Sequence, residues 1–539
     1  MLGGRRNRHL LLSLRRPIRP TTTPLARRRP VRRLRLPVRS IGVIENPIVG
    51  DYIGYYFDRF SMVRLNTHHL ALRGMAGNDS DFERILTKKD LFVLAFGAMI
   101  GWGWIIQTGF WIDEAGVAGS VLGFVVGAIM VCVVGLIYGE LTSAMPFVGG
   151  EHVYSFRALG PLWSFVCTWS LVLGYVGVVV FEVVALPSAM AFIVPGFNVL
   201  ELWTVAGEPV YASWILVGGI GAIVMTGLNY RGVKPAAQFQ TLLTLVIGLA
   251  GVMLVIGALF NGQTQANPPL SDVGTAGVAT VAIMTPFMFV GFDVIPQSAE
   301  EADVPPRVIG LLIPAAVSLA ALFYVGVIWA SGQAMPGVEL VESPLPAAAA
   351  METIFSSQLI GRIMALAGIA GILTSWNSFL LGASRAVFAL ADSGMIPRRI
   401  NALHPEYNTP STAIVLIGGL SIFAPLFGEQ MLVWIVNASG LGLVVAWFLV
   451  VVSFLVLRYR EPGLSRPLKL PSGYAFGAAG LVLTLGFIGL YLPGGPSALV
   501  WPYEWAIVLC WTLLGVVLYG ITSTDSEIEL ADLEANELE

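Results

Sequence analysis

Two apolar stretches decide the fold of this 539-residue chain. Residues 94–105 read Leu-Ala-Phe-Gly-Ala-Met-Ile-Gly-Trp-Gly-Trp-Ile, and residues 285–301 read Thr-Pro-Phe-Met-Phe-Val-Gly-Phe-Asp-Val-Ile-Pro-Gln-Ser-Ala-Glu-Glu. A glycine inside a helix costs about 1 kcal/mol relative to alanine, and a proline removes a backbone donor. Gly97 and Gly101 alone would suit close helix packing, but Gly101 and Gly103 lie on different faces. Both stretches therefore predict helices that are interrupted at mid-length.

The composition places these stretches in a membrane. Hydrophobic residues make up 56% of the sequence and charged residues 12%, against about 25% charged residues in soluble proteins. This excludes a soluble globular protein. A bilayer core needs about 20 apolar residues per helix. Twelve such runs are present: 91–111, 118–142, 161–190, 211–229, 236–260, 276–299, 308–332, 359–391, 410–427, 431–457, 474–492 and 501–521.

The interrupted spans are the first and the sixth, which are five spans apart. Because five is an odd number, these two spans would cross the bilayer in opposite directions. Interruptions at corresponding places in two halves indicate a transporter built from inverted repeats, with its site at the midplane. Half-helix N-termini would face an anion there, and freed carbonyls a cation. Asp293 would either contact the ligand or cap the restarted helix.

The positive charges give the orientation. If the first span starts in the cytoplasm, eleven Lys and Arg residues of the core lie on the inner side and only Arg362 lies on the outer side. This distribution predicts that both termini are cytoplasmic.

The formal net charge of -3 hides two unequal parts. Residues 1–74 contain 16 Arg, no Lys and three acids, which leaves 15 Lys and Arg against 31 Asp and Glu in the rest. We expect this leader to be disordered. It is either a basic arm for anionic lipids or, the reading we favour, a non-native extension upstream of a start at Met75. Because no nucleic-acid-binding fold accompanies this basic leader, we expect no nucleic-acid partner. The acidic segment 522–539 is expected to be a disordered cytoplasmic tail.

Ordered motifs over about 85–460 resemble those of the amino acid, polyamine and organocation permeases. They are Gly97-Ala-Met-Ile-Gly-Trp-Gly103, Tyr138-Gly-Glu-Leu141, Gly149-Gly-Glu151, Asn229-Tyr-Arg-Gly-Val-Lys234 and Phe289-Val-Gly-Phe-Asp293. The resemblance implies an all-α integral membrane protein with a LeuT-like core of five plus five inverted helices and two extra helices. The parts would be a juxtamembrane segment 75–90, repeats 91–260 and 276–457, and the last two helices in 474–521.

The resemblance also implies a substrate site at the two interruptions. The substrate carboxylate would bind the amides around Gly101, Trp102 and Gly103, with Ile100 also in the substrate site. The amine would lie near the carbonyls of Phe289, Val290 and Phe292, with Gly291 and Asp293 completing the second interruption. Trp102 replaces a small Ser or Thr of the family and should reduce the room beside the carboxylate. With Tyr175, the aromatic rings favour a neutral or apolar substrate side chain.

Two coupling ions are open. Thr374 and Ser375 resemble the hydroxyl pair of sodium-coupled carriers, with carbonyls of Gly97 and Ile100 as further ligands. Alternatively, the two hydroxyls bond to their own helix. Some proton-coupled relatives carry a lysine in the fifth span, where this chain has an apolar isoleucine, which favours Na+.

Glu182, deep in the third span, is a candidate for a proton or a substrate amine. Its alternative is a hydrogen bond to a neighbouring helix. No cofactor other than Na+ or H+ is expected.

The sequence therefore predicts a secondary active transporter that imports an amino acid across the cytoplasmic membrane, surrounded by lipid and coupled to Na+. One alternative is proton-coupled or exchange transport of a cationic amino acid, an amine or another organocation. A second is a membrane sensor that binds the substrate without transporting it. An enzyme is not expected, because the nearest resemblance to a catalytic pair, His152 beside Glu151, lies in a turn.

Overall fold

A computed structural model describes residues 82–263, 267–495 and 498–537. The leader 1–74 and the proposed start at Met75 lie outside the described residues. The described part is helical except for a hairpin of two antiparallel strands, β1 (Glu201–Val205) and β2 (Glu208–Tyr211). The prediction of an all-α protein is thus confirmed.

The helices follow the hydropathy runs. In chain order they are α2 (Lys88–Met99), α3 (Gly103–Ala144), α4 (Glu151–Leu159), α5 (Pro161–Ile193), α6 (Ala212–Tyr230), α7 (Val233–Asn261), α8 (Leu270–Met288), α9 (Val294–Gln297), η1 (Ala299–Glu301), α10 (Pro306–Gly332), α11 (Gly337–Glu342), α12 (Pro346–Phe355), α13 (Gln358–Asp392), η2 (Arg398–Asn401), α14 (Ser411–Ser421), η3 (Ala424–Phe427), α15 (Gln430–Arg460), α16 (Gly473–Tyr491) and α17 (Tyr503–Glu537).

Ten helices of the described part are long and apolar enough to cross a membrane. The expected count of twelve is not confirmed. The first expected span is shared between α2 and the start of α3, and α3 then continues through the second span. Its backbone bends at Gly116, whose φ of 60° is a conformation that glycine adopts without steric penalty. The ninth expected span is the short α14 followed by η3.

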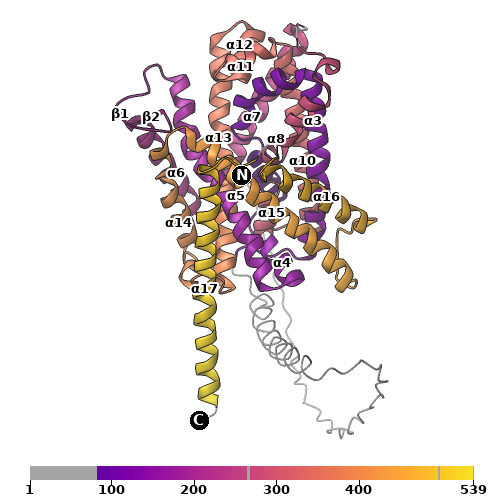
Figure 1. Ribbon diagram of the computed structural model, residues 1–539, viewed down its shortest axis with the longest axis vertical. Coiled ribbons are helices and arrows are strands. Elements are labelled where there is room, and N and C mark those ends of the chain that lie inside the picture. Colours follow the sequence, from indigo (N-terminus) through magenta and orange to yellow (C-terminus); the bar gives the residue numbers. More distant parts are fainter. Residues whose placement is uncertain (1–81, 264–266, 496–497, 538–539) are drawn as a thin grey trace, which may run out of the picture. The chain divides into compact units, whose positions relative to one another are not determined.

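The acidic tail differs from its prediction. The helix α17, at the C-terminal end in Figure 1, extends to Glu537 instead of ending with the apolar run. Since the tail is rich in Glu, Ala and Leu, which favour helices, the preceding helix can continue into it.

The interrupted helices lie among other helices of the core. α2 packs against α7, α10 and α13, and α3 packs along α8 and α10. Further along the chain, α5 packs against both α13 and α15. The space between these helices is filled by large apolar side chains, of which Trp104, Trp111 and Trp376 are fully buried.

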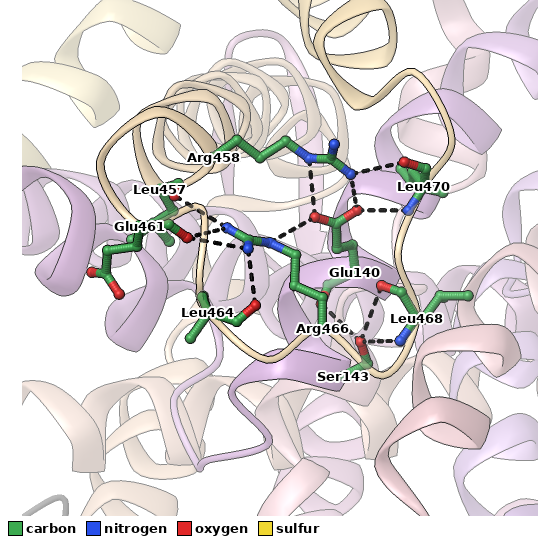
Figure 2. Close-up of polar contacts among 9 residues, drawn as sticks. All are labelled: Glu140, Ser143, Leu457, Arg458, Glu461, Leu464, Arg466, Leu468 and Leu470. Carbon is green, nitrogen blue, oxygen red and sulfur yellow. Dashed lines mark hydrogen bonds and ion pairs between the residues drawn. The ribbon is translucent and has the colours of Figure 1, made fainter.

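One carboxylate ties the loop after α15 to α3 (Figure 2). Glu140 accepts hydrogen bonds from Arg458 Nε (3.1 Å) and from the Leu470 amide (2.8 Å), and it forms an ion pair with Arg466 Nε at 3.0 Å. A second nitrogen of Arg458 also contacts the carboxylate. Glu140, Arg458, Arg466 and Leu470 are called the Glu140 cluster below.

Candidate functional site

The first helix is interrupted between Met99, where α2 ends, and Gly103, where α3 begins. Ile100 closes α2 by donating its N–H to the Phe96 carbonyl (3.1 Å). Gly101 has no room for a side chain, since a Cβ there would lie 2.9 Å from Ser375 Oγ. The interruption expected from the glycines is therefore present, and it is pressed against α13.

The sixth helix is interrupted between Met288, where α8 ends, and Val294, where α9 begins. Gly291 has a φ of 123°, and a Cβ there would lie 2.5 Å from the Cβ of Ala98 in α2. Glycine is the residue that fits both the conformation and the close approach. The two interruptions, far apart in the sequence, consequently lie against each other.

One side chain joins the two interruptions. The hydroxyl of Tyr324 in α10 lies 2.7 Å from the Met99 carbonyl and 3.0 Å from the Met288 carbonyl, which are the last residues of α2 and α8. A helix leaves its last carbonyls without partners, so this hydroxyl satisfies groups that the interruptions expose. Sequence reasoning missed Tyr324, although a tyrosine in the middle of an apolar span signals that its hydroxyl needs a polar partner.

Asp293 stabilises the second interruption without acting as a helix cap. It occupies the N-cap position of α9, but its side chain makes no capping hydrogen bond. One carboxylate oxygen instead accepts from the Gly291 amide (3.1 Å), and the other accepts from Trp447 Nε1 (3.0 Å). No local sequence signal points to Trp447, because it lies 154 positions away in α15.

The aromatic rings of the interruptions have separate neighbours. The Trp102 ring packs against Gly368 of α13, where the missing side chain leaves space for it. The Phe289 ring lies 5.4 Å from the Tyr324 ring, and the Phe292 ring lies 5.2 Å from the Trp447 ring. All three rings are buried, as is Val290. The structure therefore brings together the backbones of the two interruptions, while their aromatic side chains contact different parts of the core.

The hydroxyls expected to bind sodium bond to their own helix. Thr374 Oγ1 and Ser375 Oγ each lie 2.9 Å from the Gly371 carbonyl oxygen. A Cβ on Gly371 would lie 3.4 Å from the Ile100 carbonyl oxygen, so the first interruption does reach this turn of α13. The Cα of Gly97 faces α7 instead of α13. A Cβ added to Gly97 would lie 2.5 Å from Thr244 Oγ1 of α7.

Glu182 of α5 contacts Ser375. The residue predicted to bind a proton or an amine thus lies beside a residue predicted to bind Na+. Its side chain is buried, its Oε1 would lie 3.5 Å from a Cβ on Gly101, and its Oε2 has no hydrogen-bond partner. A buried carboxylate with so few partners is costly in its charged form. This arrangement suits a carboxyl group that binds a proton or a cation at the first interruption.

Comparison with known proteins identifies the family. Residues 86–521 match the amino acid permease family, a range that includes both interrupted helices. The chain belongs to this family. The permease is accordingly a multi-pass membrane transporter and not an enzyme.

Relatives with assigned substrates resemble this permease over most of its length. It is 24% identical to the branched-chain amino acid permease BcaP of Bacillus subtilis, over 83% of this chain and 94% of that protein. It is 23% identical to the methylthioribose transporter of the same organism, over 82% and 93% of the two chains. Identity with the human cationic amino acid transporter 4 is 26%, over 71% of this chain and 61% of the transporter.

Proposed function

We propose that this permease is a secondary active transporter that imports an amino acid across the cytoplasmic membrane by alternating access. The observation that carries the proposal is the meeting of two interrupted helices whose exposed carbonyls share the Tyr324 hydroxyl. In this proposal the chain crosses the membrane twelve times, because α3 bends at Gly116 between two crossings and the short α14 with η3 makes one more. Its inverted repeats are 91–260 and 276–457, and both termini are cytoplasmic.

The substrate is held mostly by backbone. Its carboxylate binds the amides of Gly101, Trp102 and Gly103, where α3 begins, since the first N–H groups of a helix are free and its N-terminus favours an anion. The Ile100 amide takes no part, because it already donates to the Phe96 carbonyl. Its amine binds carbonyls of the second interruption, at Phe289, Val290 and Phe292. A neutral, apolar side chain suits the buried aromatic surroundings, and the similarity to a branched-chain amino acid permease supports this choice.

Sodium is the coupling ion of the proposal, bound by carbonyls of Gly97 and Ile100 and by the hydroxyls of Thr374 and Ser375. The closeness of the Ile100 carbonyl to the turn at Gly371 supports this site. In the described structure the Thr374 hydroxyl points to the Gly371 carbonyl, and the Ser375 hydroxyl contacts both that carbonyl and Glu182. Both hydroxyls would have to turn from these oxygens to an ion.

Uptake into proteoliposomes under separate sodium and proton gradients tests the proposal. Branched-chain and cationic amino acids and methylthioribose are compared as labelled substrates. The double variant Thr374→Ala with Ser375→Ala is expected to lose sodium-driven uptake. Thr512→Ala is the matched control, because its hydroxyl bonds to its own helix in an exposed part of α17, 2.7 Å from the Val508 carbonyl. Binding without uptake of any substrate would instead indicate a sensor.

Glu182 supports a second candidate function. In it the permease transports a cationic amino acid or an amine, or couples transport to protons. The specific observation is that this buried carboxyl group lies beside Gly101 through its Oε1 while its Oε2 has no hydrogen-bond partner. Uptake that is driven by pH alone and is unaffected by the double variant would discard the sodium site. Glu182→Gln should then abolish that uptake.

A further inference from the structure

The helix α4 is held against the inner piece of the interrupted sixth helix. Its first turn follows Gly149 and Gly150, whose φ angles of 86° and 38° allow a tight entry. A Cβ on Gly150 would lie 2.6 Å from the Cβ of Pro296 in α9. α4 is not among the ten long apolar helices, so it belongs to the connection between α3 and α5.

The contact between α4 and α9 contains a buried carboxyl group with too few partners. Glu151 is fully buried, and the amide nitrogen of Gln297 donates a hydrogen bond to its Oε2. Its Oε1 has no partner, and neither do Gln297 Oε1 and the neighbouring Ser298 hydroxyl. Tyr138 lies near enough to favour the charged carboxylate, but its hydroxyl is not aligned for a hydrogen bond.

The positive charges near α4 are engaged by other groups. Arg385 pairs with Glu301, Arg458 with Glu140 and Arg157 with Glu461, and Arg460 donates to the Ala158 carbonyl (3.3 Å). His152 adds no charge at neutral pH, because burial lowers its pKa to about 4. Its Nδ1 lies within hydrogen-bond distance of Ser164 and Thr168.

The electrostatics favour a neutral Glu151. Burial raises the pKa of Glu151 well above its ordinary value, and the negative charge of Asp293 raises it further. Among the described residues, no other titratable group near Glu151 can supply a positive charge, since these groups are Tyr138, Tyr175 and Cys167. Burial without a compensating positive charge therefore favours the neutral, protonated form of Glu151 while α9 is packed against α4.

We propose that Glu151 is a proton-binding site of the inner gate, and that a cytoplasmic proton must occupy it for α9 to close onto α4. This inference rests on the proposed function, because it needs an inner gate that opens and the cytoplasmic orientation of α4. Opening would separate α9 from α4 and expose Glu151 to water, where the carboxyl group loses its proton. The ligand is the proton alone, and the proton returns to the cytoplasm.

The linkage has a definite sign. The closed gate binds one proton more than the open gate between the ordinary pKa of a glutamic acid and its raised value in the closed state. Lower cytoplasmic pH therefore favours closure, and higher pH favours opening, by up to about tenfold per pH unit for one proton. The pH on the outer side should have no such effect through this group.

The first experiment measures proton binding without transport. Thermal unfolding of the purified full-length protein is followed from about pH 5 to pH 9 for the wild type, Glu151→Gln and Glu504→Gln. Glu504 is the matched control, a buried glutamate whose oxygens accept from Asn437 Nδ2 (2.7 Å) and the Val500 amide (2.6 Å). Glu151→Gln mimics the protonated group, so its Tm relative to wild type should rise with pH. A constant difference across the range would overturn the site.

The second experiment measures the gate. Uptake is recorded while the pH on the inner and outer faces is varied independently. Wild type and Glu504→Gln should respond to the inner pH, and Glu151→Gln should lose that response and behave at every inner pH like wild type at low pH. An unchanged inner-pH response in Glu151→Gln would refute the gate role. If no substrate is taken up but the unfolding experiment shows the proton, the proposed function fails and the proton site stands.

Discussion

Replacing Glu140 by glutamine should destabilise the fold far more than replacing the glutamate of a neighbouring surface pair. Glu140 is fully buried, and the side chains of Arg458 and Arg466 are only 11% and 5% exposed. Removing one member of a buried ion pair leaves an uncompensated charge and typically costs about 3 to 5 kcal/mol. Glu140→Gln leaves two such guanidinium groups, so a loss of about this size is expected.

Glu461 provides the matched control, because it also pairs with an arginine in this region. Its partner is Arg157, and the two side chains are 32% and 38% exposed. Exposed pairs contribute about 0 to 1 kcal/mol, since water screens the attraction and ordering two long side chains costs entropy. Glu461→Gln should therefore have little effect on stability.

Thermal unfolding in detergent distinguishes the two variants. Scaling the entropy of unfolding to a chain of this length gives roughly 1 to 2 °C in Tm per kcal/mol. Glu140→Gln should thus lower Tm by about 3 to 10 °C, and Glu461→Gln by about 2 °C or less. In a double-mutant cycle, Arg466→Gln should cost less in the Glu140→Gln background than alone, because the two side chains interact directly. Equal Tm values for the two glutamine variants would refute the reasoning.

Three further substitutions follow from the site. Tyr324→Phe leaves two buried carbonyls without their donor, at a cost of about 1 to 3 kcal/mol; uptake should fall by about fivefold or more, as measured by initial rates in proteoliposomes. Gly291→Ala should abolish uptake, because of its φ of 123° and the contact with α2, whereas Gly486→Ala, with open space around it, should be neutral. The folded protein keeps His152 neutral down to a pKa of about 4, while the unfolded chain binds the proton near 6.5; stability should therefore fall between about pH 7 and pH 4, by up to about 3 kcal/mol, and the fall in Tm should be smaller in His152→Gln.

The sequence could predict where the helices break but not what holds the breaks together. Gly101 and Gly291 are local signals, since each glycine marks a place where no side chain fits or where φ is positive. Tyr324 and Trp447 carry no such signal, because their roles depend on carbonyls and a carboxylate brought to them by distant parts of the chain. Hydropathy divides the chain by composition, so it separates the runs 91–111 and 118–142 but does not show that one helix, α3, continues between them with a bend at Gly116.

The buried carboxyl groups of the described part differ in their partners, and the difference indicates which of them can exchange an ion. Glu140 and Glu301 each face arginine, so their charge is compensated and their role is to fix elements in place. The two buried carboxyl oxygens without any hydrogen-bond partner belong to Glu151 and Glu182. Both of these groups touch an interrupted helix, Glu182 beside Gly101 and Glu151 against α9. Because an uncompensated carboxyl group is stable in the core only with a bound proton or cation, we infer that the interruptions are the places where movement of a helix and exchange of a charge are physically linked.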